Sequence, residues 1–140
     1  MDIAEHALES ARAGIDTNVR LAPLIRPGTK PVPPQEVTGR IRFTTDLKQL
    51  RGADYVFEMV IEDWAVKRPL YGELDTLCRS EVPFGVNTSA IPITRVASVT
   101  GRPDRVIGTH FMNPAPLKPT VEVIRGHHTS DVTWRARGRC

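Results

Sequence analysis

The polar residues with the clearest potential for chemistry follow short apolar segments that have the pattern of strands. Glu62 comes directly after the apolar run Tyr55–Ile61, Asn87–Ser89 follows a second apolar stretch, and His110 ends a third. In open α/β sheets, ligands bind beyond the carboxyl ends of the strands. The sequence therefore predicts that these side chains lie at one edge of a sheet.

Glu122 stands in a position where it can orient His110. It comes 12 residues after His110, beyond a loop that contains Pro114, Pro116 and Pro119. Such a loop can return the chain alongside its own strand, so that Glu122 accepts a hydrogen bond from one imidazole nitrogen. The other nitrogen is then free to act as a general base. This pairing predicts proton-transfer chemistry at His110.

Each of these residues also has a structural interpretation. A lone histidine is more often a structural or surface residue, and a serine after a strand is often a helix cap. Glu122 could pair with Arg125 instead, and Glu62 could only favour the start of the helix that follows it. His110 and the adjacent pair His127–His128 lack a carboxylate or cysteine at ligand spacing, so no metal site is predicted.

The elements that must position these residues alternate between helix and strand along the chain. Asp63 is expected to cap a helix whose buried stripe is formed by Val66, Leu70, Leu74 and Leu77, with Pro69 as an interior anomaly. Alternation at the spacing of βαβ units predicts an α/β fold with a mainly parallel sheet. The predicted elements are helices over 2–25, 63–79 and 92–100, strands over 40–43, 55–61, 83–86, 106–111 and 121–124, a brief helical turn ending at Leu50, and an irregular proline-rich segment from about 26 to 36.

Composition excludes several classes of protein. A length of 140 residues with 40% hydrophobic and 25% charged residues suits one globular domain. There is no apolar run that could span a bilayer, and the opening MDIAEHALES lacks a secretory pattern, so a cytoplasmic protein without membrane contact is expected. The net charge of +3 comes from scattered residues, which argues against a nucleic-acid partner. Cys78 and Cys140 form neither a disulfide framework nor a metal cluster, and Cys78 is expected in the core.

Several motifs, taken together, resemble the 3-hydroxyacyl-CoA dehydrogenase family. The segment VIGTHFMNP over Val106–Pro114, followed by VEVIRG over Val121–Gly126, is similar to the signature of that family. Upstream, RIRFTTDL over Arg40–Leu47, the stretch 58–67 and Asn87–Ser89 match the same family in the same order and with similar spacing. The resemblance covers roughly residues 2 to 133.

The resemblance implies a Rossmann-type, doubly wound NAD-binding domain. The enzyme would oxidise a 3-hydroxyacyl thioester of CoA or of an acyl carrier protein to the 3-oxoacyl form, or run in reverse. By position, His110 would be the general base, Glu122 would orient it and balance its charge, and Ser89 would hydrogen-bond the substrate oxygen. The positions that contact the cofactor are matched by Glu62, Lys67 and Asn87. A homodimer is implied for a full-length form.

The chain also departs from the family pattern. It contains no G-x-G-x-x-G turn, whose amides cradle the pyrophosphate of NAD, so an incomplete Rossmann domain without the first strand and glycine-rich turn is expected over residues 1–133. The family's second, helical domain has no counterpart, and residues 134–140 are expected to be a tail outside the family. Pro92 and the stretch 117–120 resemble a branch from polyketide gene clusters, which acts on carrier-protein-bound hydroxyacyl groups while making extender units.

Two functions therefore remain open from the sequence. One is a truncated oxidoreductase that binds NAD weakly or not at all and is inactive by itself. The other is a non-catalytic interaction module that has kept the central sheet and lost its cofactor. The presence of His110, Glu122 and Ser89 favours the first, and the absence of the glycine turn favours the second.

Overall fold

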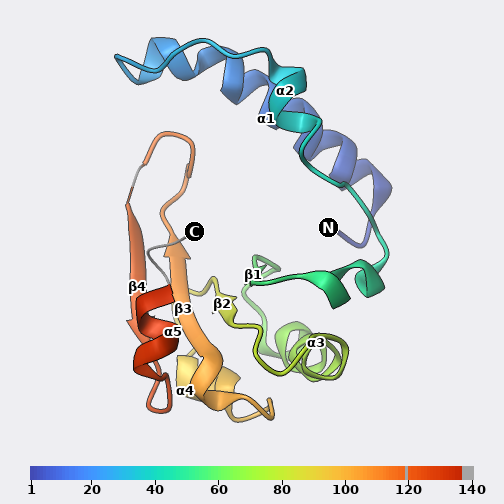
Figure 1. Ribbon diagram of the computed structural model, residues 1–140, viewed down its shortest axis with the longest axis vertical. Helices are drawn as coiled ribbons and strands as arrows, with labels where there is room; N and C mark the ends of the chain where they lie inside the picture. The colour runs from blue at the N-terminus through green and yellow to red at the C-terminus, as the bar shows by residue number, and fades with distance from the viewer. Residues whose placement is uncertain (119, 137–140) are drawn as a thin grey trace. The chain divides into compact units, whose positions relative to one another are not determined.

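The computed structural model describes residues 1–118 and 120–136, which fall into two compact units (Figure 1). The first unit is Met1–Gln49, and the second begins at Leu50. All the predicted site residues belong to the second unit. Among the described residues, no helix is both long enough and apolar enough to cross a membrane.

Two helices that pack on each other form the first unit, α1 (Glu5–Ile25) and α2 (Pro34–Thr38). Helix α1 confirms the helix predicted over 2–25. Helix α2 shows that the prediction of an irregular segment up to residue 36 was wrong at its end. Pro34 is the first residue of α2, a position where the fixed backbone angle of proline and its missing N–H both suit a helix.

The segment 40–43, which was predicted to be a strand, is irregular. A strand needs a hydrogen-bonded neighbour, and the sheet formed by the described residues does not include this segment. Its aromatic residue, Phe43, instead lies under the guanidinium of Arg12, at 4.4 Å from the ring centre. The predicted helical turn is present as a 3₁₀ turn over Leu47–Gly52, and the Asp46 carboxylate accepts a hydrogen bond at its start.

A four-stranded sheet in the order β1-β2-β3-β4 is the framework of the second unit (Figure 1). Strands β1 (Val56–Glu58), β2 (Phe84–Val86) and β3 (Val106–Phe111) run parallel, and β4 (Val121–Arg125) is antiparallel to β3. This confirms the predicted α/β class with a mainly parallel sheet. Strand β1 is shorter than predicted, because the amide of Val60 donates to the Glu58 side chain, at 2.7 Å, rather than to a neighbouring strand.

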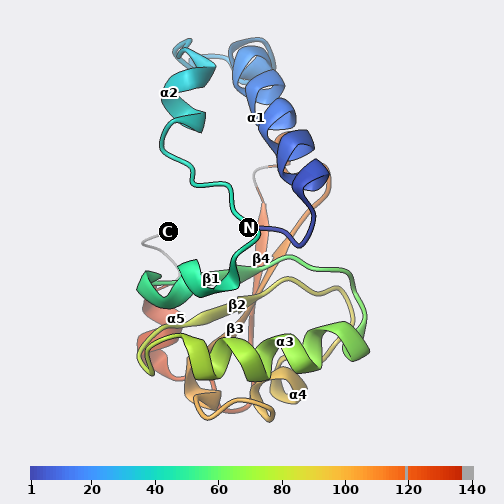
Figure 2. The same cartoon turned by 90° about the vertical axis from the view of Figure 1, so that its right-hand side faces the viewer.

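Three helices accompany the sheet, α3 (Trp64–Leu77), α4 (Ile93–Ala97) and α5 (Asp131–Ala136) (Figure 2). Asp63 caps α3 as predicted, accepting from the amide of Ala65 at 2.8 Å. Helix α4 is shorter than the predicted 92–100. Helix α5 extends into the segment predicted to be a tail, whose residues 137–140 lie outside the described residues; the proposed boundary at 133 stays a prediction.

The buried face of α3 differs from the predicted stripe. Leu74 is buried as expected, but Val66 is 42% exposed, and Lys67 and Tyr71 are both fully buried. The stripe is rotated by one residue because both polar side chains turn inward to the carboxylate of Glu58. A pattern of apolar residues does not anticipate this, because it treats a lysine as a surface residue.

Close packing between β3 and α4 places the loop that precedes α4. A Cβ atom on Gly108 would lie 2.9 Å from the Cδ1 atom of Ile93, which is closer than carbon atoms approach. The same Cβ atom would lie 2.9 Å from the Cβ atom of Ile124 on β4, so glycine at this position lets β4 and the first side chain of α4 both approach β3 closely. The loop Thr88–Pro92, which leads into α4, is held near the end of the same strand.

Arg102 joins the end of α3 to the segments that follow it. Its guanidinium forms an ion pair with Asp75 at 2.7 Å and donates to the carbonyl oxygens of Asp75 and Cys78, at 2.7 and 3.0 Å, and of Arg79. The last carbonyls of a helix have no partner within it, so a buried guanidinium replaces the water that would otherwise solvate them. Arg102 is only 6% exposed.

We expect Arg102→Lys to lower the free energy of unfolding by about 3 kcal/mol, because one ammonium cannot serve the buried carbonyls that the planar guanidinium reaches. Arg105→Lys is the matched control: within the part of the chain that the structure describes, the Arg105 side chain donates to one carbonyl, that of Glu81, at 3.1 Å. Its effect should stay within about 0.5 kcal/mol. Denaturant unfolding of both variants measures the difference, and equal effects would contradict this role for Arg102.

Candidate active site

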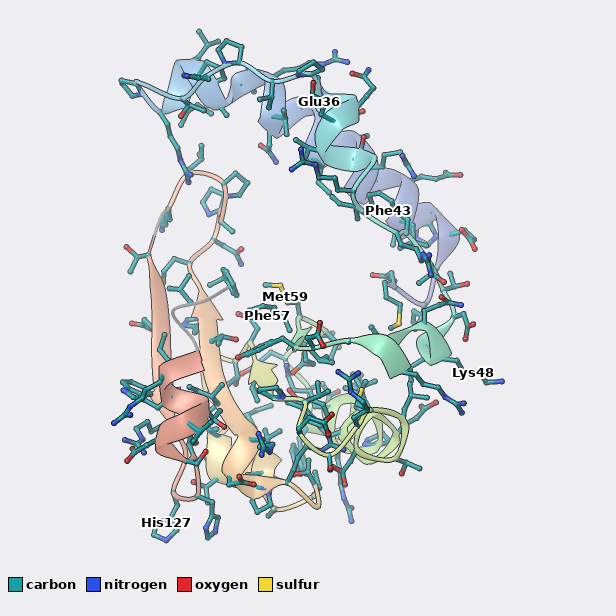
Figure 3. The ribbon with its side chains drawn as sticks, viewed as in Figure 1. Glu36, Phe43, Lys48, Phe57, Met59 and His127 are labelled. Carbon is teal, nitrogen blue, oxygen red and sulfur yellow. The ribbon has the colours of Figure 1, made fainter. Side chains whose placement is uncertain are left out.

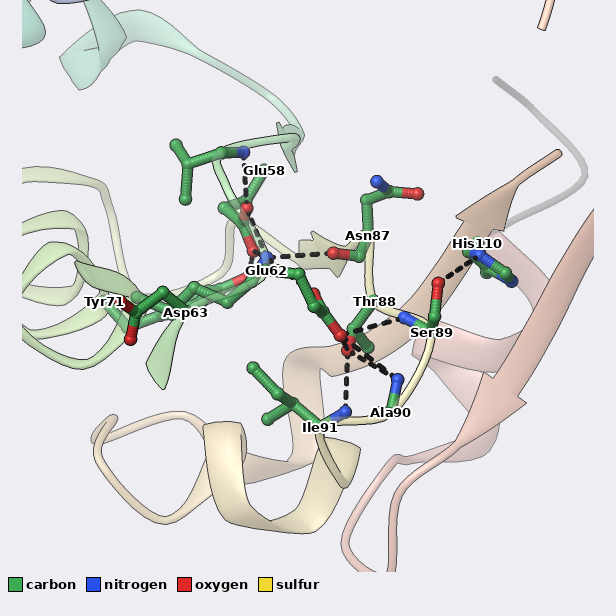
Figure 4. Close-up of polar contacts among 12 residues, drawn as sticks. Glu58, Glu62, Asp63, Tyr71, Asn87, Thr88, Ser89, Ala90, Ile91 and His110 are labelled. Carbon is green, nitrogen blue, oxygen red and sulfur yellow. Dashed lines mark hydrogen bonds and ion pairs between the residues drawn. The ribbon is translucent and has the colours of Figure 1, made fainter. Parts of the chain in front are cut away.

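The carboxyl ends of the parallel strands bring the predicted polar residues together (Figure 4). Glu62 lies beyond β1, Ser89 lies beyond β2, and His110 lies near the end of β3. The Ser89 hydroxyl is 3.0 Å from Nε2 of His110, and the Ser89 amide is 3.0 Å from Oε1 of Glu62. Three strands that are far apart in the sequence thus contribute to one site.

The β3–β4 hairpin gives His110 its acidic partner. His110 and Glu122 are opposite each other in the antiparallel register, and Nδ1 of His110 is 2.9 Å from Oε2 of Glu122. A carboxylate at Nδ1 favours the tautomer with its proton there, which leaves the Nε2 lone pair to accept from the Ser89 hydroxyl. The predicted contact is therefore present, and the catalytic role of the pair stays a prediction.

Glu62 contacts the loop that carries Ser89. Its Oε1 atom accepts from the amides of Ser89 and Ala90, at 3.0 and 3.1 Å, and from the hydroxyl of Thr88. Partial burial of the carboxyl raises the pKa of Glu62, but the hydrogen bonds from Thr88, Ala90 and Ser89, together with the charge of Lys67, lower the pKa by more. Glu62 is therefore charged at neutral pH.

A buried cluster behind Glu62 holds the ends of β1 and β2 together. The Lys67 ammonium donates to both Glu58 oxygens, at 2.7 Å each, and to the backbone oxygen of Asn87 at 2.9 Å. The hydroxyl of Tyr71 donates to Glu58 at 2.9 Å. Burial, followed by the nearby Glu58 charge, raises the pKa of the Tyr71 phenol, which therefore stays protonated and able to donate.

Sequence reasoning identified Lys67 but missed Glu58, Tyr71 and Thr88. One signal was available: Glu58 is a charged residue inside the apolar run Tyr55–Ile61, and a buried charge needs a partner. Lys67, predicted to contact a cofactor, has a side chain with no exposed area, and Glu62 lies 3.7 Å from it. A cofactor role for Lys67 stays a prediction.

Asn87 fixes the end of β2 against β3. Its Oδ1 atom accepts from the amide of Phe111 at 3.0 Å, while its backbone oxygen accepts from Lys67. Asn87 is therefore held at both its side chain and its backbone. This places it at the carboxyl edge of the sheet, where the predicted nicotinamide contact would require it, although that contact stays a prediction.

A shallow pocket of about 230 Å³ lies in front of His110 and is lined by Ser89, Glu122 and the start of α4. A hollow of about 470 Å³ beside Arg102 is larger, but it lies at the amino ends of the strands, away from the edge where α/β sheets bind ligands. His127 lies at that same far end of the sheet (Figure 3). Among the described residues, no three His, Cys, Asp or Glu side chains could hold a metal ion.

The arrangement favours proton transfer rather than nucleophilic attack by Ser89. A serine, histidine and carboxylate in hydrogen-bonded sequence can also act as a nucleophilic triad, which needs free amides to stabilise an oxyanion. Here the amides of Ser89 and Ala90 both donate to Glu62, and that of Ile91 donates to Thr88 at 2.8 Å. Ser89 is thus placed to donate a hydrogen bond to a substrate oxygen whose proton His110 takes.

Comparison with known proteins agrees with this geometry. The model of the NAD-binding domain of 3-hydroxyacyl-CoA dehydrogenase matches residues 1–137. The chain belongs to this family. It is 48% identical over 102 residues to a probable 3-hydroxybutyryl-CoA dehydrogenase of Deinococcus radiodurans, covering 73% of this chain and 37% of that protein. A 3-hydroxybutyryl-CoA dehydrogenase of Bradyrhizobium diazoefficiens is 39% identical over 139 residues, covering 96% of this chain and 46% of that protein.

Solved structures of the same family share the fold. The (S)-3-hydroxybutyryl-CoA dehydrogenase of Ralstonia eutropha superposes with a TM-score of 0.90 at 33% identity, covering 99% of this chain and 49% of that one. The Escherichia coli K12 3-hydroxybutyryl-CoA dehydrogenase superposes with a TM-score of 0.85 at 33% identity, covering 96% of this chain and 28% of that one. The chain therefore spans less than half the length of these relatives.

NAD is the cofactor of this domain family, and the polar groups of the site fit the nicotinamide end of NAD. At the carboxyl edge of the sheet, Oε2 of Glu62 has one ion-pair contact among the described residues, 3.7 Å from Lys67, and so keeps lone pairs for a ligand. The Ser89 amide donates to the other oxygen of the same carboxylate, and the Asn87 backbone oxygen accepts from Lys67. For the pyrophosphate, the 140 residues offer no G-x-G-x-x-G sequence.

We expect Lys67→Met to lower the free energy of unfolding by about 3–5 kcal/mol, because it leaves the buried Glu58 carboxylate without its counter-ion. Lys118→Met, at an exposed lysine of the hairpin loop, is the control and should change it by less than about 0.5 kcal/mol. Chemical denaturation followed by circular dichroism gives both values. A stability equal to that of the control would show that the ion pair does not hold the strand ends.

Proposed function

We propose that this chain carries the proton-transfer residues of an NAD-dependent 3-hydroxyacyl thioester dehydrogenase. The observation that carries the proposal is the hydrogen-bonded order Ser89, His110, Glu122, with distances of 3.0 and 2.9 Å. It supplies one hydrogen-bond donor and one base facing the same small pocket, as removal of a hydroxyl proton requires. The names of the relatives support a 3-hydroxyacyl-CoA substrate.

In the proposed reaction, Nε2 of His110 takes the proton of the substrate hydroxyl. The hydroxyl of Ser89 turns from His110 to the substrate and donates to the oxygen as its negative charge develops. Glu122, at 2.9 Å from Nδ1, balances the charge of the imidazolium that results. NAD, when bound, supplies the acceptor for the hydride that leaves the same carbon atom. Asn87 and Glu62 would border its nicotinamide end, with Lys67 behind them.

We further propose that the 140-residue chain binds NAD weakly and is inactive by itself, because its sequence has no glycine-rich turn to cradle the pyrophosphate. The acyl carrier, CoA or a carrier protein, is left open, because it rests on Pro92 and on residues 117–120, of which 119 lies outside the described residues. A homodimer of a full-length form and a cytoplasmic location also remain part of the proposal. The competing function is a non-catalytic interaction module.

Transfer into a relative tests the catalytic residues directly. The part of the Bradyrhizobium diazoefficiens protein that aligns with 96% of this chain would be exchanged for the residues of this chain, which include His110. We expect the chimera to form NADH from 3-hydroxybutyryl-CoA, and His110→Gln to lower its kcat by about 10²–10⁴-fold, because the general base is lost. His127→Gln, at the far end of the sheet, is the matched control. A folded, NAD-binding chimera that forms no NADH, or whose kcat does not depend on His110, would favour the interaction module.

NAD binding by the chain itself can be measured through Trp64, the first residue of α3, which follows Glu62 and Asp63. We expect no saturable change in its fluorescence on titration with NAD below about 1 mM, which corresponds to a binding free energy weaker than about −4 kcal/mol. The same titration of Trp64→Phe is the control. Its remaining tryptophan, Trp134 on α5, reports quenching by NAD that does not come from binding near Trp64. Saturation at micromolar NAD would contradict the proposed loss of affinity.

A further inference from the structure

One carboxylate oxygen contacts three consecutive residues of the loop between β2 and α4. Oε1 of Glu62 accepts three hydrogen bonds, from the Thr88 hydroxyl and from the amides of Ser89 and Ala90. These donors come from three consecutive residues, and Ser89 is the middle one (Figure 4). Among the described residues these positions make no strand or helix bonds. The loop is fixed instead by Glu62 and by the Thr88 hydroxyl, which accepts from the amides of Ala90 and Ile91.

Glu62 is itself fixed from behind by the buried cluster. The Lys67 ammonium lies 3.7 Å from Oε2 of Glu62 and donates to the Asn87 backbone at 2.9 Å. The same ammonium is bound to Glu58, the last residue of β1. The loop is therefore held at its start by Lys67 and at its centre by Glu62. Lys67 is bound to the last residue of β1, and Glu62 follows β1 in the chain.

We propose that Glu62 is a positioning residue, whose carboxylate sets the hydroxyl of Ser89 against Nε2 of His110. The proposal rests on the proposed function, in which Ser89 and His110 face the substrate. A 3.0 Å contact between a loop serine and a strand histidine tolerates only about 0.5 Å of error in the loop. The amide of Ser89, bound to Glu62, sets the backbone from which that hydroxyl projects.

The charge of Glu62 is part of this role. Hydrogen bonds to an ionised acceptor are roughly twice as strong as those to a neutral one, and here three donors share one oxygen. The same bonds lower the pKa of Glu62, after burial has raised it, so the carboxylate keeps its charge at neutral pH. By occupying the amides of Ser89 and Ala90, Glu62 also keeps Ser89 a donor rather than a nucleophile.

The contact can be followed in the whole 140-residue chain without substrate or cofactor. Nitrogen-15 NMR of histidine reports the hydrogen bond at Nε2 of His110, which His110→Gln assigns among the four histidines. Spectra are recorded well above the ordinary imidazole pKa of about 6.5, where the ring is neutral. Ser89→Ala removes the donor and defines the full shift of the Nε2 signal.

We expect Glu62→Ala to move the Nε2 signal in the direction of Ser89→Ala by at least half of that shift. In the double variant, Glu62→Ala should add nothing further to Ser89→Ala, because both changes remove the same contact. A Glu62→Ala variant that leaves the signal in place, or whose shift adds fully to that of Ser89→Ala, overturns the proposal. Glu62→Gln, which keeps the shape without the charge, should give a smaller shift in the same direction and replaces Glu62→Ala if the latter does not fold.

Asp63→Asn is the matched control. It removes one negative charge at the neighbouring residue while asparagine still caps α3, so it tests whether charge alone moves the His110 signal. We expect no shift, and a shift equal to that of Glu62→Gln overturns the proposal. The outcome is separate from that of the proposed function: a coupled Glu62–Ser89 pair with no NADH formation in the chimera would reject only the dehydrogenase activity.

Discussion

The contact between the buried Lys67 ammonium and the Glu58 carboxylate, at 2.7 Å, is the constraint on which the ends of β1 and β2 and the loop that carries Ser89 depend. Removing both charges from water is costly, and a buried ion pair offsets that cost only when its remaining donors and acceptors are satisfied. Here the Asn87 carbonyl, the Tyr71 hydroxyl and the Val60 amide complete it. The cluster thereby holds together the ends of two strands and one helix, which apolar packing alone would not align so specifically.

The two pairs of contacts at the site are positioned in different ways. His110 and Glu122 owe their contact to the register of the β3–β4 hairpin and would meet in any chain that kept that register. Ser89 is different, because it lies on a loop, and its place depends on Glu62 and, behind it, on Lys67. The positions of the site residues therefore have two different causes. Strand pairing places His110 and Glu122, whereas the charged side chains of Glu62 and Lys67 place Ser89.

The residues proposed to be catalytic can be distinguished from the glycine-rich turn that would cradle the cofactor. The sheet edge with His110, Glu122, Ser89 and Asn87 lies within a chain that spans 49% or less of the relatives compared above. Over 99% of its length the chain superposes on the (S)-3-hydroxybutyryl-CoA dehydrogenase of Ralstonia eutropha with a TM-score of 0.90. The local order of the site thus follows from the second unit's own contacts, since every one of its hydrogen bonds joins residues after Leu50.

The sequence by itself determined the fold class, the parallel sheet, the Asp63 cap and the meeting of His110 with Glu122. Those features depend on local periodicity, cap chemistry and a short hairpin, which neighbouring residues specify. Only the tertiary structure decided that 40–43 is not a strand, that α2 forms after Pro33, and that α3 turns Lys67 and Tyr71 inward. Whether segment 40–43 finds a strand partner, and which charged side chains are buried, depend on contacts made elsewhere in the chain. The contacts of Glu58 with Lys67 and Tyr71 are examples, and a pattern of apolar residues does not carry that information.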